Sequence, residues 1–460
     1  MKQDVSLSPT KELACFAARL QQDEIPTDVL QRITELYVDW AGSALSGKGS
    51  RAIEIIEQFS HVMGPTEGKS EILINRRSTS AFFAAFTNAA SSHVSEQDDV
   101  HNGSVFHPAT IVFPAALAVA QDIGASGIEF LTACVAGYEV GIRVGECLGR
   151  SHYKIFHTTG SAGTFAAAAA CGNLLKLDGD QMLSAFGSAG TQSAGLWEFL
   201  RDGADSKQLH TAKSSAEGLL SAWIASKGFS GAKHIIEGNQ GLAAGTSSDA
   251  DFQKLVDRLG KRWSVLETSF KFHASCRHTH PAADALLKVL EDNGLDAADV
   301  SEVICHVHQA AIDVLGPIKR PHSVHQAKFC MAATLGLILV HRKAGLAEFE
   351  GFLEDNAALS FLDRISMTLD EEVNQIYPEK WVGKVTVRTL DGNIFTARVD
   401  DPKGDPGNTL SRDEIDAKAR FLSQHSGAVT SGETDALMAR LWRVADAETI
   451  AIFDGRTNVL

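Results

Sequence analysis

The sequence lacks the features of a membrane-bound or exported protein. None of its 460 residues falls in a run of about 18 consecutive apolar residues, the length that a membrane-spanning helix needs. The N-terminal sequence MKQDVSLSPTKEL has no apolar core of the kind found in secretory signal peptides. These absences predict a cytoplasmic protein with no membrane partner.

Cysteine is sparse and shows no pairing pattern. The seven cysteines are an odd number and form no C-x-x-C pair; they are Cys15, Cys134, Cys147, Cys171, Cys276, Cys305 and Cys330. Scattered cysteines of this kind are typical of free thiols in a reducing compartment, not of a disulfide framework.

An excess of basic residues is also absent. The 42 Lys and Arg residues face 57 Asp and Glu residues, which gives a formal net charge of -15. Nucleic-acid binding needs a basic face to neutralise phosphates, so we expect no nucleic-acid partner. An anionic small molecule could still bind, but only at a local cluster of cations within the acidic whole.

Two common families of site motif are missing as well. The sequence has no G-x-S-x-G, the turn that carries the serine of many hydrolases. It has neither G-x-x-x-x-G-K-[ST] nor a strand leading into G-x-G-x-x-G, so no nucleotide site is predicted.

Helix signals dominate the first half of the chain. Ser8-Pro9 predicts a helix with proline in its first turn, and Ser126 to Glu129 form a capping box ahead of another. Within that second helix glycine recurs at every fourth position, which would let a neighbouring helix approach closely; these residues are Gly137, Gly141, Gly145 and Gly149.

The pattern changes near Thr268. Alternating strands are predicted on either side of Asp391-Gly392, a two-residue hairpin signal, and residues 324–340 read as one long buried helix. A capping box at Ser411 to Glu414 marks a return to helix. We therefore predict a mainly α fold, with a large all-helical domain (residues 1–267 plus 405–460) and an inserted smaller α+β domain (268–404).

The first stretch that could carry chemistry is EQDDVHNGSVFH. It holds Glu96, Asp98, Asp99, His101 and His107 on a loop between two expected helices. Loops held by a rigid scaffold concentrate binding and catalytic groups. The alternative is that Asp98 and Asp99 only cap helices and that His101 is solvated.

The second stretch is SHYKIFHTTGSAGTFAAAAA, in which His157 and Thr158 precede a helix of small residues. The exposed N–H groups of such a helix start suit a carboxylate or phosphate. In the simpler interpretation Thr158 or Thr159 caps the helix and His157 packs against it.

The third stretch, RDGADSKQLHTAKSSAEG, places Lys207, His210 and Lys213 at positions i, i+3 and i+6. That spacing gathers charge on one side of a helix. From the residues alone, a solvated charged face is the favoured interpretation, and an anion site is the alternative.

The fourth stretch is SFKFHASCRHTHPAADALL, where Lys271 and Arg277 are candidate carboxylate-binding cations. If the chain were extended, Cys276, His278 and His280 would lie on one side, which raises a metal site as the alternative. Zinc sites usually use C-x2–4-C or H-x3–5-H spacing, and neither is present, so we expect no metal.

Taken in order, these four stretches resemble the MmgE/PrpD family, whose members include 2-methylcitrate dehydratase, cis-aconitate decarboxylase and iminodisuccinate epimerase. The resemblance covers nearly the whole chain. It implies a helical domain interrupted by an α+β lid domain, with the active site between them, a small polycarboxylate substrate, a homodimer, and no metal or organic cofactor.

The resemblance also implies roles for individual residues. The catalytic positions fall on Glu96, His107, His157, Lys207 and Lys271. The substrate-binding positions fall on Asp99, His101, Thr158, His210, Arg277 and His278. Reactions of this family build negative charge beside a carboxylate, so cations must stabilise it, and a proton must move to or from carbon, which histidine can do near neutral pH.

Three positions depart from the family pattern. Glu96 stands where an aspartate is expected, Val100 where the decarboxylases have a hydroxyl residue, and Ile318 near their active-site tyrosine. These departures count against decarboxylation of cis-aconitate. The favoured reaction is that of a hydro-lyase like 2-methylcitrate dehydratase, with a dicarboxylate epimerase and then a cis-aconitate decarboxylase as alternatives. A non-enzymatic polycarboxylate-binding protein and a metal-dependent hydrolase remain as other classes.

Overall fold

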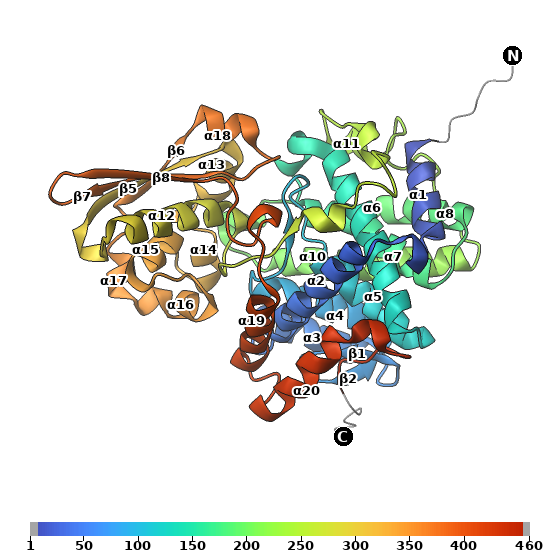
Figure 1. Cartoon of the computed structure of the whole chain (residues 1–460). Helices are drawn as coiled ribbons and strands as arrows, with labels where there is room; N and C mark the ends of the chain where they lie inside the picture. The colour runs from blue at the N-terminus through green and yellow to red at the C-terminus, as the bar shows by residue number, and fades with distance from the viewer. Residues whose placement is uncertain (1–7, 454–460) are drawn as a thin grey trace, which may run out of the picture.

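The computed structural model describes residues 8–453 and consists mainly of α-helices (Figure 1). Its first part contains α1 (Pro9–Arg19), α2 (Thr27–Leu45), α3 (Arg51–Met63), α4 (Ala81–Val94), α5 (Ala109–Ile123), α6 (Gly127–Tyr153), α7 (Thr158–Leu174), α8 (Gly179–Gly190), α9 (Phe199–Asp202), α10 (Ser206–Ser226) and α11 (Leu242–Thr246). Helix α7 lies at its centre and packs against α5, α6, α8 and α10. Within the described chain, no helix combines the length and apolar character required to cross a membrane.

Local sequence signals fix several helix ends. Helix α1 begins at Pro9, and the Ser8 side chain accepts a hydrogen bond from the backbone N–H of Lys11. The predicted capping box of α6 forms between Ser126 and Glu129. These caps confirm the predicted starts, because each supplies an acceptor for N–H groups that the first turn leaves unpaired.

The repeated glycines of α6 allow close packing against α5 and α7. A Cβ atom at Gly141 would lie 2.5 Å from the ring of Phe106 and 2.6 Å from Cβ of Ala166. Gly149 serves a different purpose, because its φ of 71° makes a kink inside α6. The prediction of close helix approach is confirmed for the glycines in the middle of α6.

Two short antiparallel pairs accompany these helices. Strand β1 (Ser70–Ile72) pairs with β2 (Arg77–Thr79). Strand β3 (Val100–His101) pairs with β4 (Thr268–Ser269), with Val100 opposite Ser269 and His101 opposite Thr268. The second pair joins the acidic loop before α5 to the point where the chain leaves the first part.

The second part contains one four-stranded sheet in the order β6-β5-β7-β8. Strand β5 runs parallel to β6 and antiparallel to β7, which pairs in turn with β8. Helices α12 and α15 lie on the sheet (Figure 1). The elements are α12 (His280–Asn293), β5 (Val300–Val307), α13 (Gln309–Leu315), α14 (Val324–Lys328), α15 (Met331–His341), α16 (Leu346–Gly351), α17 (Asn356–Leu359), β6 (Ile365–Leu369), α18 (Glu371–Ile376), β7 (Gly383–Thr389) and β8 (Ile394–Val399).

Two local predictions in this part need correction. The hairpin at Asp391-Gly392 forms, but its loop is longer than two residues, because Thr389 N–H bonds to the carbonyl of Asn393. The single helix predicted over 324–340 is wrong, because α14 ends at Lys328 and α15 starts at Met331. The backbone N–H of Cys276 donates to the carbonyl of Lys328 (2.8 Å), so a distant segment occupies an acceptor that an unbroken helix would use internally.

The chain then returns to helix. Helix α19 (Arg412–His425) packs on α2, and α20 (Ser431–Trp442) contacts both. One apolar core runs from Leu13 to Phe270 and resumes with residues from Leu410 to Ile452, while a second is built mostly from residues 274–387. These two cores support the division into domains at 267/268 and 404/405, which we retain as a proposal.

Candidate active site

The acidic loop between α4 and α5 is held by its own side chains. The carboxylate of Asp99 accepts hydrogen bonds from the backbone N–H of Ala109 (2.9 Å) and from the hydroxyl of Tyr138 (2.7 Å). Burial raises the pKa of Asp99 well above its usual range. Asp99 therefore ties the loop to the start of α5 and to α6, and its predicted role in substrate binding stays a prediction.

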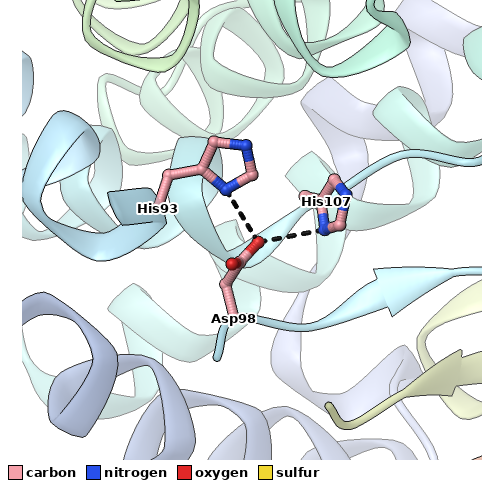
Figure 2. Close-up of side chains that lie close together, drawn as sticks. All are labelled: His93, Asp98 and His107. Carbon is pink, nitrogen blue, oxygen red and sulfur yellow. Dashed lines mark hydrogen bonds and ion pairs between the residues drawn. The ribbon is translucent and has the colours of Figure 1, made fainter. Parts of the chain in front are cut away.

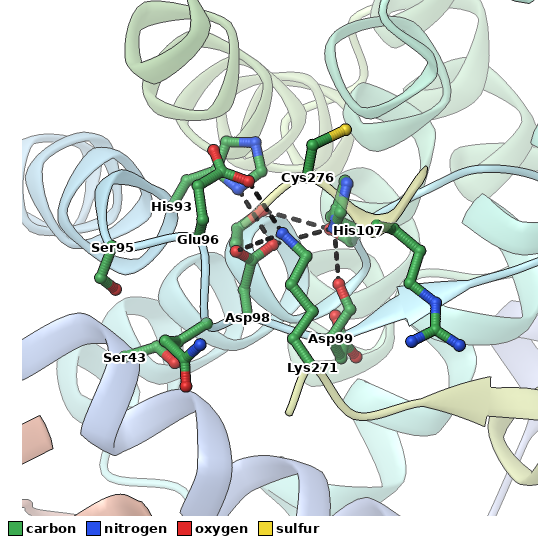
Figure 3. Close-up of polar contacts among 12 residues, drawn as sticks. Ser43, His93, Ser95, Glu96, Asp98, Asp99, His107, Lys271 and Cys276 are labelled. Carbon is green, nitrogen blue, oxygen red and sulfur yellow. Dashed lines mark hydrogen bonds and ion pairs between the residues drawn. The ribbon is translucent and has the colours of Figure 1, made fainter. Parts of the chain in front are cut away.

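Glu96 lies between two buried lysines. Its Oε1 is ion-paired with Lys207 of α10, and its Oε2 lies 2.9 Å from Nζ of Lys271 (Figure 3). All three side chains are at most 3% exposed. Burial alone would raise the pKa of Glu96, but the two ammonium groups hold it well below the usual range, so the carboxylate is ionised.

The charge pattern around Lys207 did not predict that this lysine would be buried. The favoured interpretation of its charge run was a solvated face, and the structure contradicts this, because Lys207 is 2% exposed. Burial lowers its pKa, and Glu96 opposes that effect. In contrast Asp98 and Glu96 outweigh burial at Lys271 and raise its pKa.

Asp98 joins two histidines. Its Oδ2 lies 2.9 Å from Nδ1 of His93 and 3.0 Å from Nδ1 of His107 (Figure 2). Burial would raise the pKa of Asp98, but His93, Lys271 and His107 hold it well below the usual range. The ionised carboxylate therefore accepts hydrogen bonds from both rings.

This arrangement fixes the tautomer of His107. Its Nδ1 also lies 2.6 Å from the backbone carbonyl of Asp99, which can only accept a hydrogen bond. The proton is therefore on Nδ1, and Nε2 carries a lone pair. Burial lowers the pKa of His107, against the opposing effect of Asp98, so the neutral ring that can take up a proton is favoured.

His157 lies next to this group at the N-terminus of α7. Its ring stacks on His93 with centroids 5.7 Å apart, and its Nδ1 lies 3.3 Å from Nδ1 of His210. Burial and the neighbouring His210 lower the pKa of His157 well below the usual range. Within residues 8–453 its buried Nε2 has no hydrogen-bond partner.

Two predicted residues lie on the side of the second part. Arg277 forms an ion pair with Asp405, which also accepts hydrogen bonds from Asn102 (3.0 Å) and Ser269 (2.6 Å). The Nε2 of His278 lies 3.1 Å from the hydroxyl of Tyr153. Arg277 is thus already compensated by a carboxylate, so substrate binding by it stays a prediction.

The other two predicted residues lie apart from the lysine pair. His101 contacts the hydroxyl of Ser104 (2.9 Å) and the carboxylate of Glu267 (3.4 Å). The methyl group of Thr158 packs toward Gly145, while the neighbouring Thr159 hydroxyl accepts a hydrogen bond from the backbone N–H of His107. Their predicted contacts with substrate remain predictions.

A cavity of about 840 Å³ lies between α6 and α13, and none of the predicted catalytic residues is among its lining residues. Tyr153, Trp197 and Tyr377 are among its lining residues. Trp197 packs on His157 with ring centroids 4.7 Å apart, and Tyr153 bonds to His278. Tyr153 and Trp197 therefore lie between the cavity and the buried histidines.

Two sets of side chains bring possible metal ligands together within residues 8–453; they are His93, Asp98 and His107, and His101, Glu146 and Glu267. The ammonium of Lys271 lies 3.6 Å from Asp98, and the guanidinium of Arg262 binds both glutamates of the second set. A positively charged side chain repels a divalent metal ion, so binding of such an ion beside Lys271 or Arg262 is unfavourable. Both sets are better explained as ion-pair networks. The group Cys276, His278 and His280 is not among those that converge in the described chain.

Sequence reasoning missed His93 and Lys328, and it expected the loop acids to orient histidines without naming Asp98 as a site residue. His93 is the last-turn histidine of α4, three residues before Glu96, so its position beside the acidic loop was the available signal. Lys328 fell inside an expected buried helix, where a lone lysine was itself a signal.

The chain matches known sequences over most of its length. The MmgE/PrpD N-terminal domain model matches residues 11–255, and the MmgE/PrpD C-terminal domain model matches residues 273–444. A cis-aconitate decarboxylase of Aspergillus terreus (strain NIH 2624 / FGSC A1156) is 27% identical over 419 residues, which cover 86% of this chain and 85% of the relative. The cis-aconitate decarboxylase-like protein oryM of Aspergillus oryzae (strain ATCC 42149 / RIB 40) is 28% identical, with 90% of both chains covered. The cis-aconitate decarboxylase of Homo sapiens is 22% identical over 90% of this chain and 87% of its own.

Proposed function

Because the chain belongs to the MmgE/PrpD family, we propose that it is a lyase that removes water from a small polycarboxylate, in a reaction like that of 2-methylcitrate dehydratase. One observation carries the proposal. Two buried ammonium groups, Lys207 and Lys271, converge on a single carboxylate beside a histidine whose tautomer is fixed. Such a place suits a reaction in which negative charge grows next to a carboxylate.

In the proposed reaction, His107 removes a proton from the carbon beside a substrate carboxylate. Its Nε2 is the accepting atom, because Nδ1 is engaged by Asp98 and the Asp99 carbonyl. The electron pair of the broken C–H bond spreads into the carboxylate, and Lys207 and Lys271 stabilise the enediolate that forms. The attraction between these ammonium groups and the growing negative charge is stronger at a buried site than in water, because the dielectric constant is lower.

Loss of water needs a second proton. We propose that His157 gives it to the hydroxyl on the adjacent carbon, so that the C–O bond breaks, a C=C bond forms and water leaves. Burial keeps His157 neutral in the free protein, but a bound polyanion would raise its pKa and let it enter the reaction protonated. His210, in contact with its Nδ1, would hold the ring in place.

Decarboxylation is the second candidate, because the relatives are named cis-aconitate decarboxylases. Against it stand Val100, which is fully buried in β3, and Ile318, which packs against the second core, since neither supplies a hydroxyl group. Epimerisation of a dicarboxylate would use the same proton transfer without loss of a group. A polycarboxylate-binding protein without activity would need neither histidine.

One experiment separates these reactions. The protein is incubated with a panel of di- and tricarboxylates in deuterated water and followed by NMR. Dehydration replaces the signal of the hydroxyl-bearing carbon with two olefinic carbon signals, epimerisation gives deuterium at the carbon beside a carboxylate without loss of a group, and decarboxylation gives carbon dioxide. Binding without any exchange in the whole panel would contradict the proposal and favour a binding protein, and the Lys271→Met variant serves as the inactive control.

We also propose that the protein works as a homodimer in the cytoplasm. The described cysteines are all free, and six of the seven are buried, which suits a reducing compartment. Helix α3 exposes a group of large apolar side chains that a second copy could cover; they are Ile55, Phe59, Val62 and Met63.

A further inference from the structure

Lys328 is a buried cation that the proposed reaction does not use. It is the last residue of α14 and is 4% exposed. Its ammonium donates one hydrogen bond, to the backbone carbonyl of Ser95 (3.0 Å). Within residues 8–453 it forms no ion pair, whereas Lys207 and Lys271 share Glu96 and Arg277 is paired with Asp405.

Lys328 nevertheless belongs to the same neighbourhood as these groups. Its hydrogen-bond partner Ser95 directly precedes Glu96 in the chain, and its own carbonyl accepts from the backbone of Cys276. The next residue, Phe329, lies under the ammonium of Lys207, with 4.8 Å between Nζ and the ring centroid. Figure 3 shows the Glu96 carboxylate next to the ammonium of Lys271.

His325 accompanies Lys328 one helical turn earlier in α14. Its ring contacts Phe329 with centroids 5.2 Å apart. Its Nε2 is buried and without a hydrogen-bond partner in the part of the chain that the structure describes. Helix α14 thus brings Lys328, with one neutral acceptor, and His325, with an unpartnered Nε2, to positions i+3 and i of the same helix.

An ammonium group with a single neutral acceptor is costly to bury, because it loses hydration that one carbonyl does not replace. Among the buried lysines and carboxylates around Glu96, three ammonium groups face two ionised carboxylates, so the excess is one positive charge. A substrate carboxylate at Lys328 would supply the missing partner.

We propose that Lys328, with His325 beside it, forms a subsite for an additional carboxylate of the substrate, so that the protein prefers a tricarboxylate to a dicarboxylate. This inference rests on the proposed function, because it adds a subsite to the same polycarboxylate site. Reaction at the lysine pair fixes one carboxylate, and Lys328 recognises another that takes no part in the chemistry.

Binding of two unreactive probes tests the subsite. Tricarballylate carries three carboxylates, and glutarate has the same five-carbon chain without the middle one. We expect the wild-type protein to bind tricarballylate at least about tenfold more tightly by calorimetry, since a hydrogen bond to a charged group has about that effect. Lys328→Met should abolish this preference while glutarate binds as before, and Lys343→Met, which changes an exposed lysine of the same part, should keep it.

The pH dependence gives a second measurement that needs no variant. Burial lowers the pKa of Lys328 to about 8; the charged groups that act on it are Glu96, Glu350, Lys271 and Lys207. The preference for tricarballylate should therefore decline above about pH 8. An unchanged preference in Lys328→Met would overturn the subsite alone. Failure of both probes to bind the wild-type protein would overturn the proposed function as well.

Discussion

Glu96 reaches Lys271 from a left-handed backbone conformation: its φ is 58°, and its Oε2 lies 2.9 Å from the lysine Nζ. A residue other than glycine in this region costs on the order of 1–3 kcal/mol, and it persists only where its surroundings determine it. Here the ion pairs with Lys207 and Lys271 offset the cost of the backbone conformation. The same conformation places the carboxylate between the two lysines.

Lys207→Met should lower catalytic efficiency by about a hundredfold or more, because it removes a donor to charge that grows in the transition state. The melting temperature should fall too, since Glu96 loses one of its two buried partners. Steady-state kinetics and thermal unfolding measure both effects. Lys213→Met, on the same helix but with a partly exposed side chain, is the control and should leave efficiency nearly unchanged. If the two substitutions changed catalytic efficiency equally, Lys207 would have no specific role in the reaction.

His93 is expected to act as a positioning residue for His107 through Asp98. His93→Leu removes one hydrogen bond to the Asp98 carboxylate, a loss of about 1.5–3 kcal/mol, so kcat should fall by about tenfold to a hundredfold with little change in KM. His93→Asn keeps a donor near the position of Nδ1 and should recover part of kcat. The pH profile decides the matter: if the acid limb of kcat is the same in all three proteins, His93 does not act through His107.

Acid should destabilise the protein in a defined window. Burial lowers the pKa values of His93, His210 and His325 from 6.5 to about 4, so the unfolded chain binds protons in this range that the folded chain does not. The contribution of these histidines to the free energy of unfolding is therefore fully present above pH 6.5, and it is lost progressively as the pH falls toward 4. Melting temperatures at intervals between these values provide the test. A melting temperature that stays constant down to pH 4 would contradict the neutral buried state of these histidines.

Gly141→Ala should destabilise the helical part by about 1–3 kcal/mol, because the added methyl group overlaps Phe106 and Ala166 in a packed core. Gly432→Ala is the matched control, since nothing lies within 4 Å of its Cβ position in α20. That substitution should be neutral or stabilise by up to about 1 kcal/mol. Denaturant unfolding measures both, and similar values for the two variants would mean that α6 and α7 are not closely packed at Gly141.

The proposed homodimer should depend on the exposed face of α3. Sedimentation of the wild-type protein should give twice the chain mass, and Phe59→Glu combined with Met63→Glu should give the monomer, because charges there oppose burial in an interface. Trp223→Glu changes an exposed residue of α10 and serves as the comparison. A dimer that survives the α3 substitutions would place the interface elsewhere.

Local signals in the sequence were enough to predict the helix starts and the mainly α class. Ser8, Ser126 and Ser411 each bond to backbone groups within three residues, so their effect needs no tertiary information. Lys207 could not be placed in this way, because its partner Glu96 is 111 residues away and the same charge spacing serves a solvated helix face equally well.

The break between α14 and α15 was unpredictable for a related reason. The sequence around the break, AKFCMAA, contains neither proline nor glycine to mark a helix end, and the Lys328 carbonyl is instead occupied by Cys276, more than fifty residues earlier in the chain. The family resemblance supplied what local patterns could not, since it placed His107, Lys207 and Lys271 in one site before any distance was known.

The chain passes between its two parts near Thr268 and again near Asp405, and both crossings contact the acidic loop. On the outward crossing β4 pairs with β3, and on the return Asp405 binds Asn102. A shift of one residue in this pairing would reverse the directions of the Val100 and His101 side chains and displace the neighbouring acids. Helix α13 lines the cavity and takes no part in this strand pairing. Substitutions on the cavity face of α13 could therefore change the shape of the cavity without shifting the acidic loop.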